Sequence, residues 1–94
     1  MRARPFISYS GIPEHMRGGM KAYLERGVPG GGFLNAILEN DFMSAARKAD
    51  ITNLERLGDY ARFLRGYMPR DSYGSPAKVK AWIERGGIKG KESK

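Results

Sequence analysis

A glycine-rich turn at residues 27–32 constrains the fold of this chain more than any other stretch. The turn reads Gly-Val-Pro-Gly-Gly-Gly, and it separates two segments in which apolar residues recur at helical spacing. Proline removes a backbone N–H that a helix interior needs, and glycine loses more conformational freedom on folding than any other residue. We therefore expect short helices separated by turns rather than one long coiled coil.

Four helices are predicted from the apolar periodicity and from the residues that flank each segment. Ser75 followed by Pro76 is a strong start for the last helix, because serine caps well and proline fits the first helical position. Thr52 or Asn53 can cap the third helix, and a Thr52 cap would place Glu55 where it completes a capping box. The predicted helices cover residues 13–26, 32–48, 53–66 and 76–85.

The two ends of the chain are predicted to be irregular. Residues 1–11 are expected to form an extended arm, because Pro5 and Gly11 disfavour helix while the aromatic and β-branched residues between them favour extended backbone. Residues 89–94 are expected to form a charged tail. The remaining residues, 12–88, make a single helical domain, since 94 residues leave no room for a second. The predicted fold class is all-α, a compact bundle of about four short helices with an extended N-terminal arm.

The residue types that catalysis and metal binding need are scarce. The chain has no cysteine and a single histidine, His15, which excludes a disulfide, a cysteine nucleophile and a standard zinc site. The glycine-rich turn is not followed by the Gly-Lys-Ser/Thr of a P-loop, and no Gly-x-Ser-x-Gly nucleophile elbow is present. No apolar run approaches the ~18 residues of a membrane span. We therefore expect a non-enzymatic protein with no cofactor, metal or membrane partner.

The turn at residues 29–32 is a candidate anion-binding site. Free N–H groups at a helix N-terminus attract anions, and glycine lets a phosphate approach the backbone. Arg26 lies just before the turn and Asn35 one helical turn after it, while tyrosines supply aromatic surface for a nucleotide base or a protein partner. The alternative is that the turn is only a hinge. The predicted ligand-binding residues are Arg26, Gly30, Gly31, Gly32, Asn35, Tyr9 and Tyr73.

The second half of the chain is strongly basic. Residues 1–55 carry seven basic and six acidic side chains, whereas residues 56–94 carry ten and four, and the whole chain has a net charge of +7. Such an excess favours anionic partners, including nucleic acid. Tyrosines could stack on bases, but Trp82 lies on an apolar stripe and is predicted to belong to the core. The candidate nucleic-acid contacts are Arg56, Arg62, Arg65, Lys78, Lys80 and Arg85.

Four strings resemble a group of short proteins encoded by tailed bacteriophages and prophages. They are IPEHM at residues 12–16, RGVPGGGFL at 26–34, LENDF at 38–42 and YGSPAKVKAWI at 73–83. The likeness covers residues 12–88. In that group the turn carries fewer glycines, and tryptophan often stands at the position of Tyr73. The resemblance implies a viral accessory protein in the cytoplasm of the infected bacterium, and it implies no catalytic residues.

Two functional hypotheses follow, with a weaker third. The first is a non-enzymatic accessory protein, acting in counter-defence, that captures an anionic, nucleotide-type host signal or a host protein. The second is a small nucleic-acid-binding regulator or replication accessory that uses the basic second half. The third is a minor structural or assembly component of the virion. Self-association is plausible in each case, because a domain of this size buries only a modest core.

Overall fold

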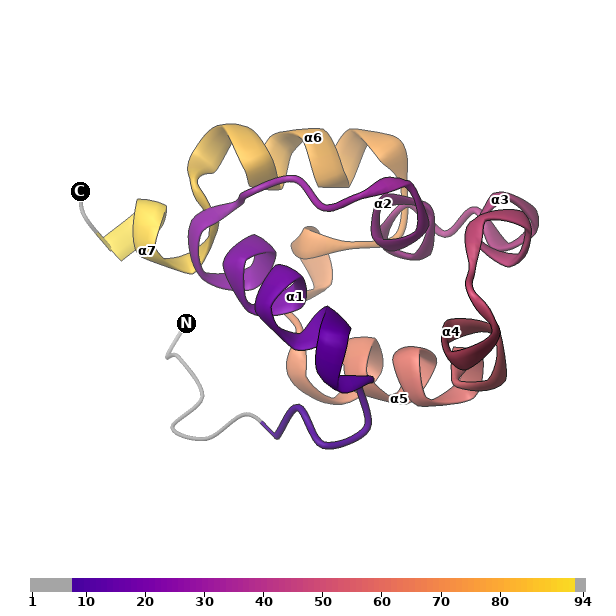
Figure 1. Ribbon diagram of the computed structural model, residues 1–94. Coiled ribbons are helices and arrows are strands. Elements are labelled where there is room, and N and C mark those ends of the chain that lie inside the picture. The colour runs from indigo at the N-terminus through magenta and orange to yellow at the C-terminus, as the bar shows by residue number, and fades with distance from the viewer. Residues whose placement is uncertain (1–7, 93–94) are drawn as a thin grey trace.

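The computed structural model describes residues 8–92, and every element in that range is helical (Figure 1). The all-α prediction is therefore confirmed for the described region, but the helices are shorter and more numerous than expected. None of them is long and apolar enough to cross a membrane. The elements are α1 (Glu14–Arg26), α2 (Gly32–Leu38), α3 (Phe42–Lys48), α4 (Ile51–Glu55), α5 (Leu57–Tyr67), the 3₁₀ helix η1 (Arg70–Ser72), α6 (Pro76–Arg85) and α7 (Gly87–Glu92).

Three large aromatic side chains organise the core: Tyr23 of α1, Tyr60 of α5 and Trp82 of α6. Trp82 Nε1 donates a hydrogen bond to the carbonyl oxygen of Tyr23 at 2.9 Å, and the Tyr23 hydroxyl donates to the carbonyl oxygen of Ser72 at 2.6 Å. These buried bonds connect α1 with α6 and with η1, which the sequence did not predict. The prediction that Trp82 belongs to the core is confirmed, since only 1% of the residue is exposed.

The helix predicted over residues 32–48 is wrong, because the chain breaks it into α2 and α3. Asn40 adopts a left-handed conformation with φ of 65°, which asparagine tolerates better than most residues. Asp41 then accepts a hydrogen bond from the Ser44 N–H at 3.2 Å and caps the new helix. As a result α3 packs against α2 instead of continuing along its axis (Figure 1).

The helix predicted over residues 53–66 is also divided. Arg56, with φ of −108° and ψ of 15°, separates α4 from α5. The cap of α4 is Asp50, whose Oδ1 accepts a hydrogen bond from the Asn53 N–H at 2.7 Å. The predicted Thr52 cap and its capping box with Glu55 are therefore wrong: Asp50 begins the helix earlier than expected.

The predicted helix over residues 76–85 is confirmed as α6, with Ser75 accepting a hydrogen bond from the Lys78 N–H. Beyond it, however, α7 (Gly87–Glu92) extends into the predicted charged tail, residues 89–94. Gly87 has φ of 71°, and a Cβ there would lie 2.6 Å from the backbone nitrogen of Gly27. Only glycine allows this close approach of α7 to the end of α1.

The predicted N-terminal arm is only partly described, because residues 1–7 lie outside the described range. The described part is a turn rather than an extended segment, since the Ile12 N–H donates to the Tyr9 carbonyl at 2.9 Å. The Tyr9 ring packs against Phe63 of α5, with ring centroids 5.2 Å apart.

Candidate functional site

The predicted anion cradle does not assemble around the glycine turn. The Gly30 N–H already donates a hydrogen bond to Asn35 Oδ1 at 3.2 Å, so Asn35 closes the turn instead of facing a ligand. Arg26 is exposed at the end of α1, where α7 packs. Residues 27–31 run from that end to the start of α2 on the other side of the molecule (Figure 1). Arg26 therefore lies away from the exposed Gly31 and Gly32.

The cation that does approach the glycines is Lys48, which the sequence did not single out. A Cβ on Gly32 would lie 3.1 Å from Lys48 Cδ and 3.8 Å from Lys48 Nζ. This contact exists because the break at Asn40 and Asp41 folds α3 back along α2. The sequence signal was that Asn-Asp pair, which is typical of a helix end followed by a new cap.

The two predicted tyrosines lie in separate packing environments. Tyr9 is half-buried against α5, and burial, together with the Glu25 carboxylate, raises its pKa. Tyr73 is half-buried against the core, beside the bond from the Gly74 N–H to the Leu38 carbonyl. None of the seven predicted ligand-binding residues lines the groove that the described residues form between α2, α3 and α5.

The predicted nucleic-acid residues are likewise divided between two sides of the molecule. α5 and α6 run along opposite sides, with α1 between them (Figure 1). Arg56, which directly precedes α5, and Arg62 on α5 both pair with Asp59. On α6, Arg85 pairs with Asp71 at 3.3 Å, and its guanidinium lies 4.3 Å from the centroid of the Trp82 ring.

Three members of that set have fewer partners. Lys78 Nζ donates to the Arg70 carbonyl oxygen at 3.5 Å. Arg65 and Lys80 are exposed and form no ion pair with the rest of the described chain. The six cations therefore do not form one continuous basic surface.

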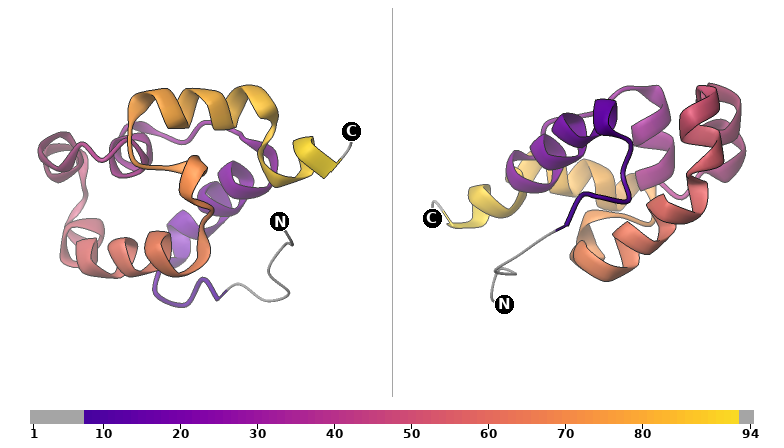
Figure 2. Two further views of the ribbon diagram at one scale, coloured as in Figure 1. Left: turned by 180° about the vertical axis from the view of Figure 1, so that it is seen from behind. Right: turned by 60° about the horizontal axis from the view of Figure 1, so that its bottom comes forward.

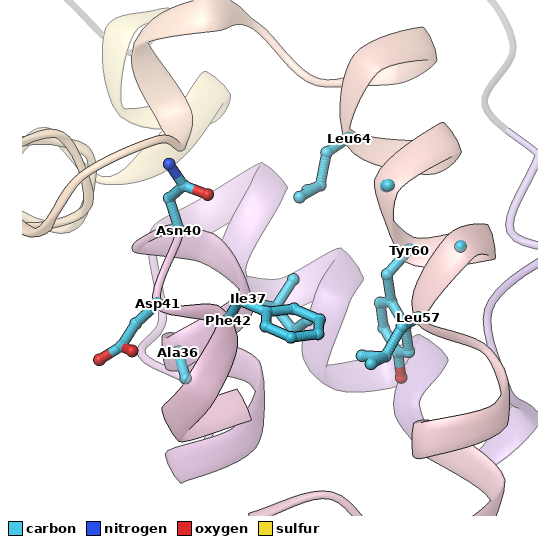
Figure 3. Close-up of a pocket in the computed structure, with 10 residues that line it drawn as sticks. Ala36, Ile37, Asn40, Asp41, Phe42, Leu57, Tyr60 and Leu64 are labelled. Atoms are coloured by element: carbon cyan, nitrogen blue, oxygen red, sulfur yellow. The ribbon is translucent and has the colours of Figure 1, made fainter. Parts of the chain in front are cut away.

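A different feature emerges where the α2–α3 corner faces α5: an open groove of about 350 Å³ (Figure 3). One wall comes from the corner and the other from α5. Ile37 and Phe42 point across the groove toward Leu57 and Tyr60, while Asn40 and Asp41 lie at its edge (Figure 3). The lining residues are Ala36, Ile37, Asn40, Asp41, Phe42, Leu57, Gly58, Tyr60, Ala61 and Leu64.

Most of the large exposed apolar side chains of the described chain lie on two helices, α3 and α4, and one of them, Phe42, also lines this groove. Among the described residues, five large apolar side chains are exposed, and four of them belong to α3 and α4. We call these four the apolar face; they are Phe42 (63% exposed), Met43 (60%), Ile51 (76%) and Leu54 (47%). Figure 2 shows α3 and α4 grouped at the end of the molecule away from α7. Exposed apolar surface concentrated on neighbouring helices is a candidate interaction surface.

A buried polar contact fixes the orientation of α4. The Tyr60 hydroxyl donates to Asn53 Oδ1 at 2.8 Å, and only 3% of Asn53 is exposed. Burial, together with the nearby charge of Asp50, raises the pKa of Tyr60, so its hydroxyl remains a donor. With Asn53 inside, Ile51 and Leu54 face outward. The apolar spacing of Leu54 with Leu57, Ala61 and Leu64 predicts one inward face for a continuous helix, but α4 is a separate helix whose buried residue is Asn53.

The charges that border the groove are unequal. Hydrogen bonds from Ser44 lower the pKa of Asp41, and the cations Arg47 and Lys48 lower it further. Asp41, at the edge of the groove, is therefore influenced by two cations of its own helix. Hydrogen bonds from Arg56 and Arg62 lower the pKa of Asp59, but Asp59 does not line the groove and lies on the side of α5 near Gly11.

Comparison with known proteins adds no further constraint. The chain matches no protein-family model, and neither curated proteins nor solved structures show a match. Within the described region, no group of three or more His, Cys, Asp or Glu side chains could hold a metal ion. The candidate site therefore rests on geometry: an apolar groove, the apolar face on the neighbouring helices, and Asp41 with two nearby cations at the groove edge.

Proposed function

We propose that this chain is a non-enzymatic binding protein that docks another protein through the apolar face and the groove. The observation that carries the proposal is the concentration of exposed apolar side chains on α3 and α4, beside a groove that is open to solvent. Aromatic residues and methionine are enriched at the cores of protein interfaces. Phe42 is the natural anchor, because it borders the groove and is itself largely exposed.

The energetics support a protein partner over a small anion. Moving a side chain such as phenylalanine or leucine from water into an apolar interface contributes roughly 1.5–3 kcal/mol. Four such side chains can supply a substantial part of a binding free energy, whereas the glycine turn offers an anion one nearby lysine. The dispersed arginines of α5 and α6 similarly give less support to nucleic-acid binding.

The setting of the proposal comes from the resemblance to short phage-encoded proteins. In that setting the docked protein belongs to the bacterial host, and the chain acts in the host cytoplasm as an accessory factor in counter-defence. Capture of a host protein is one of the two forms of the first hypothesis, and it is the form that the groove favours.

A photo-crosslinking residue at Ala61, compared with one at Ala77, tests this proposal. Both alanines are exposed on helices, but only Ala61 lines the groove. When the chain is produced in a bacterium, we expect a defined adduct from position 61 that disappears with Phe42→Ser and is absent from position 77. Equal adducts from both positions, or no adduct from position 61, would overturn the proposal.

A further inference from the structure

We infer that the groove takes an amphipathic α-helix whose flanks are acidic. This inference rests on the proposed function, because it names the kind of partner that the same groove binds. It follows from the shape of the groove, from the small residues along α5 and from the distribution of charge around the edge.

The shape of the groove favours a helix over an extended peptide. An extended peptide is commonly bound by adding a strand to a sheet edge, and the described part of the chain has no strand. Along α5 the groove presents Leu57, Ala61 and Leu64, which lie at i, i+4 and i+7 on one stripe. This stripe is about 10 Å long at 1.5 Å per residue. A helix with apolar anchors at the same spacing can lie along it.

Small residues on α5 leave room for a second backbone. Gly58 and Ala61 both line the groove, and a Cβ added to Gly58 would meet no other atom within 4 Å. Across from them, Phe42 and Ile37 project from the α2–α3 corner (Figure 3). The groove is therefore open above α5, where the small side chains leave space for the backbone of a helix.

The charge distribution selects acidic flanks. Arg65 follows Ala61 by four residues, so it lies beside the groove on the exposed side of α5, and it has no ion-pair partner in the described region. On the opposite wall, Asp41 at the groove edge is influenced by two cations, Arg47 and Lys48, so this side also holds more positive than negative charge. A partner with Glu or Asp beside its apolar anchors complements this edge. A second copy would instead bring together two chains that each carry +7.

Selection from a yeast-displayed library of helical peptides tests the inference. The library fixes leucine at i, i+4 and i+7 and varies the flanking positions among Glu, Gln and Lys. Peptides are kept if they bind the wild-type chain but not Phe42→Ser. We expect Glu to be enriched at the flanks. We also expect Arg65→Glu to weaken the selected peptides by about fivefold or more, because an attraction becomes a repulsion.

The matched control is Lys80→Glu, which makes the same change of charge at an exposed lysine of α6 away from the groove. It should leave peptide affinity unchanged, and circular dichroism should show that all three variants remain folded. Three results would overturn the inference: no enriched peptide, enrichment of Gln or Lys at the flanks, or an equal loss with Lys80→Glu.

Two comparisons separate this inference from the proposed function. If the Ala61 adduct forms and depends on Phe42 while acidic helices are not selected, docking stands and the acidic helix is wrong. If both fail, the proposed function fails as well. Sedimentation velocity provides the other comparison: self-association that Phe42→Ser abolishes and that blocks peptide binding would identify the occupant as a second copy and overturn the inference.

Discussion

At the scale of single residues, the buried hydrogen bond between Tyr60 and Asn53 determines which side of α4 faces solvent. Tyr60→Phe removes the hydroxyl donor, so that the buried Asn53 Oδ1 loses its hydrogen bond from Tyr60. An unsatisfied buried polar group costs about 1–3 kcal/mol, so the free energy of unfolding should fall by that amount. Urea denaturation measures the change.

The matched control for this prediction is Tyr67→Phe. Tyr67 lies on the same helix, is half-buried and packs against Phe63, with ring centroids 5.3 Å apart. Its hydroxyl has no hydrogen-bond partner within the described range, so the free energy of unfolding should change little. Equal effects of the two substitutions would contradict the role assigned to the Tyr60 hydroxyl.

The residue scale also separates what sequence could predict from what it could not. Trp82 was predicted to be buried because apolar spacing places it inside α6, and the spacing does not depend on other helices. In a continuous helix over residues 32–48, apolar spacing places Phe42 on a core stripe, yet 63% of it is exposed. Its burial depended on a continuous helix, and that helix is interrupted by Asn40 and Asp41.

At the scale of elements, two predicted helices are interrupted, one at Asn40 and Asp41 and the other at Arg56. These interruptions explain why the fold class could be predicted and the site could not. Composition and periodicity are enough to predict helices. The groove, however, lies between α5 and the corner that forms where Asp41 caps α3 and α3 folds back on α2, and Asp50 caps the separate helix α4 that precedes α5. Local caps of this kind compete with periodicity over a few residues, and periodicity averages over longer windows.

The packing of α7 on α1 gives an element-scale prediction. A Cβ at Gly87 would lie 2.7 Å or less from backbone atoms of Glu25, Arg26 and Gly27, and Gly87 also has a positive φ. Gly87→Ala should therefore displace α7 and lower the free energy of unfolding by more than about 1 kcal/mol. Thermal unfolding measures the loss, and amide exchange should locate it in α7 and the end of α1.

Gly18→Ala is the matched control, since it makes the same change inside α1. A Cβ there would meet no atom of another element within 4 Å, so this exposed glycine serves no packing role in the described chain. Alanine should stabilise the helix by roughly 0.5–1 kcal/mol. If Gly18→Ala were as damaging as Gly87→Ala, close approach at Gly87 would not be the cause.

At the scale of the whole molecule, three aspartates make stability depend on acid. Hydrogen bonds from Ser44 lower the pKa of Asp41, the Asn53 N–H lowers that of Asp50, and Arg56 followed by Arg62 lower that of Asp59. Each carboxyl thus has a lower pKa in the folded chain than in the unfolded chain. The unfolded chain binds more protons in this range, so stability rises with pH.

The expected consequence is acid-induced loss of stability within a defined window. The contribution of the three carboxylates is complete above their unfolded pKa, near the ordinary value of 3.8, and it disappears as pH falls through their lower folded values. These three groups should therefore cause no change in the urea midpoint of unfolding between pH 5 and 7. Below about pH 4 the midpoint should fall as they become protonated. A triple variant with asparagine at all three positions keeps capping ability at Asp41 and Asp50 but loses the charges. Its decline below about pH 4 should be shallower than that of the wild type, and an equally steep decline would place the acid sensitivity in other carboxyls.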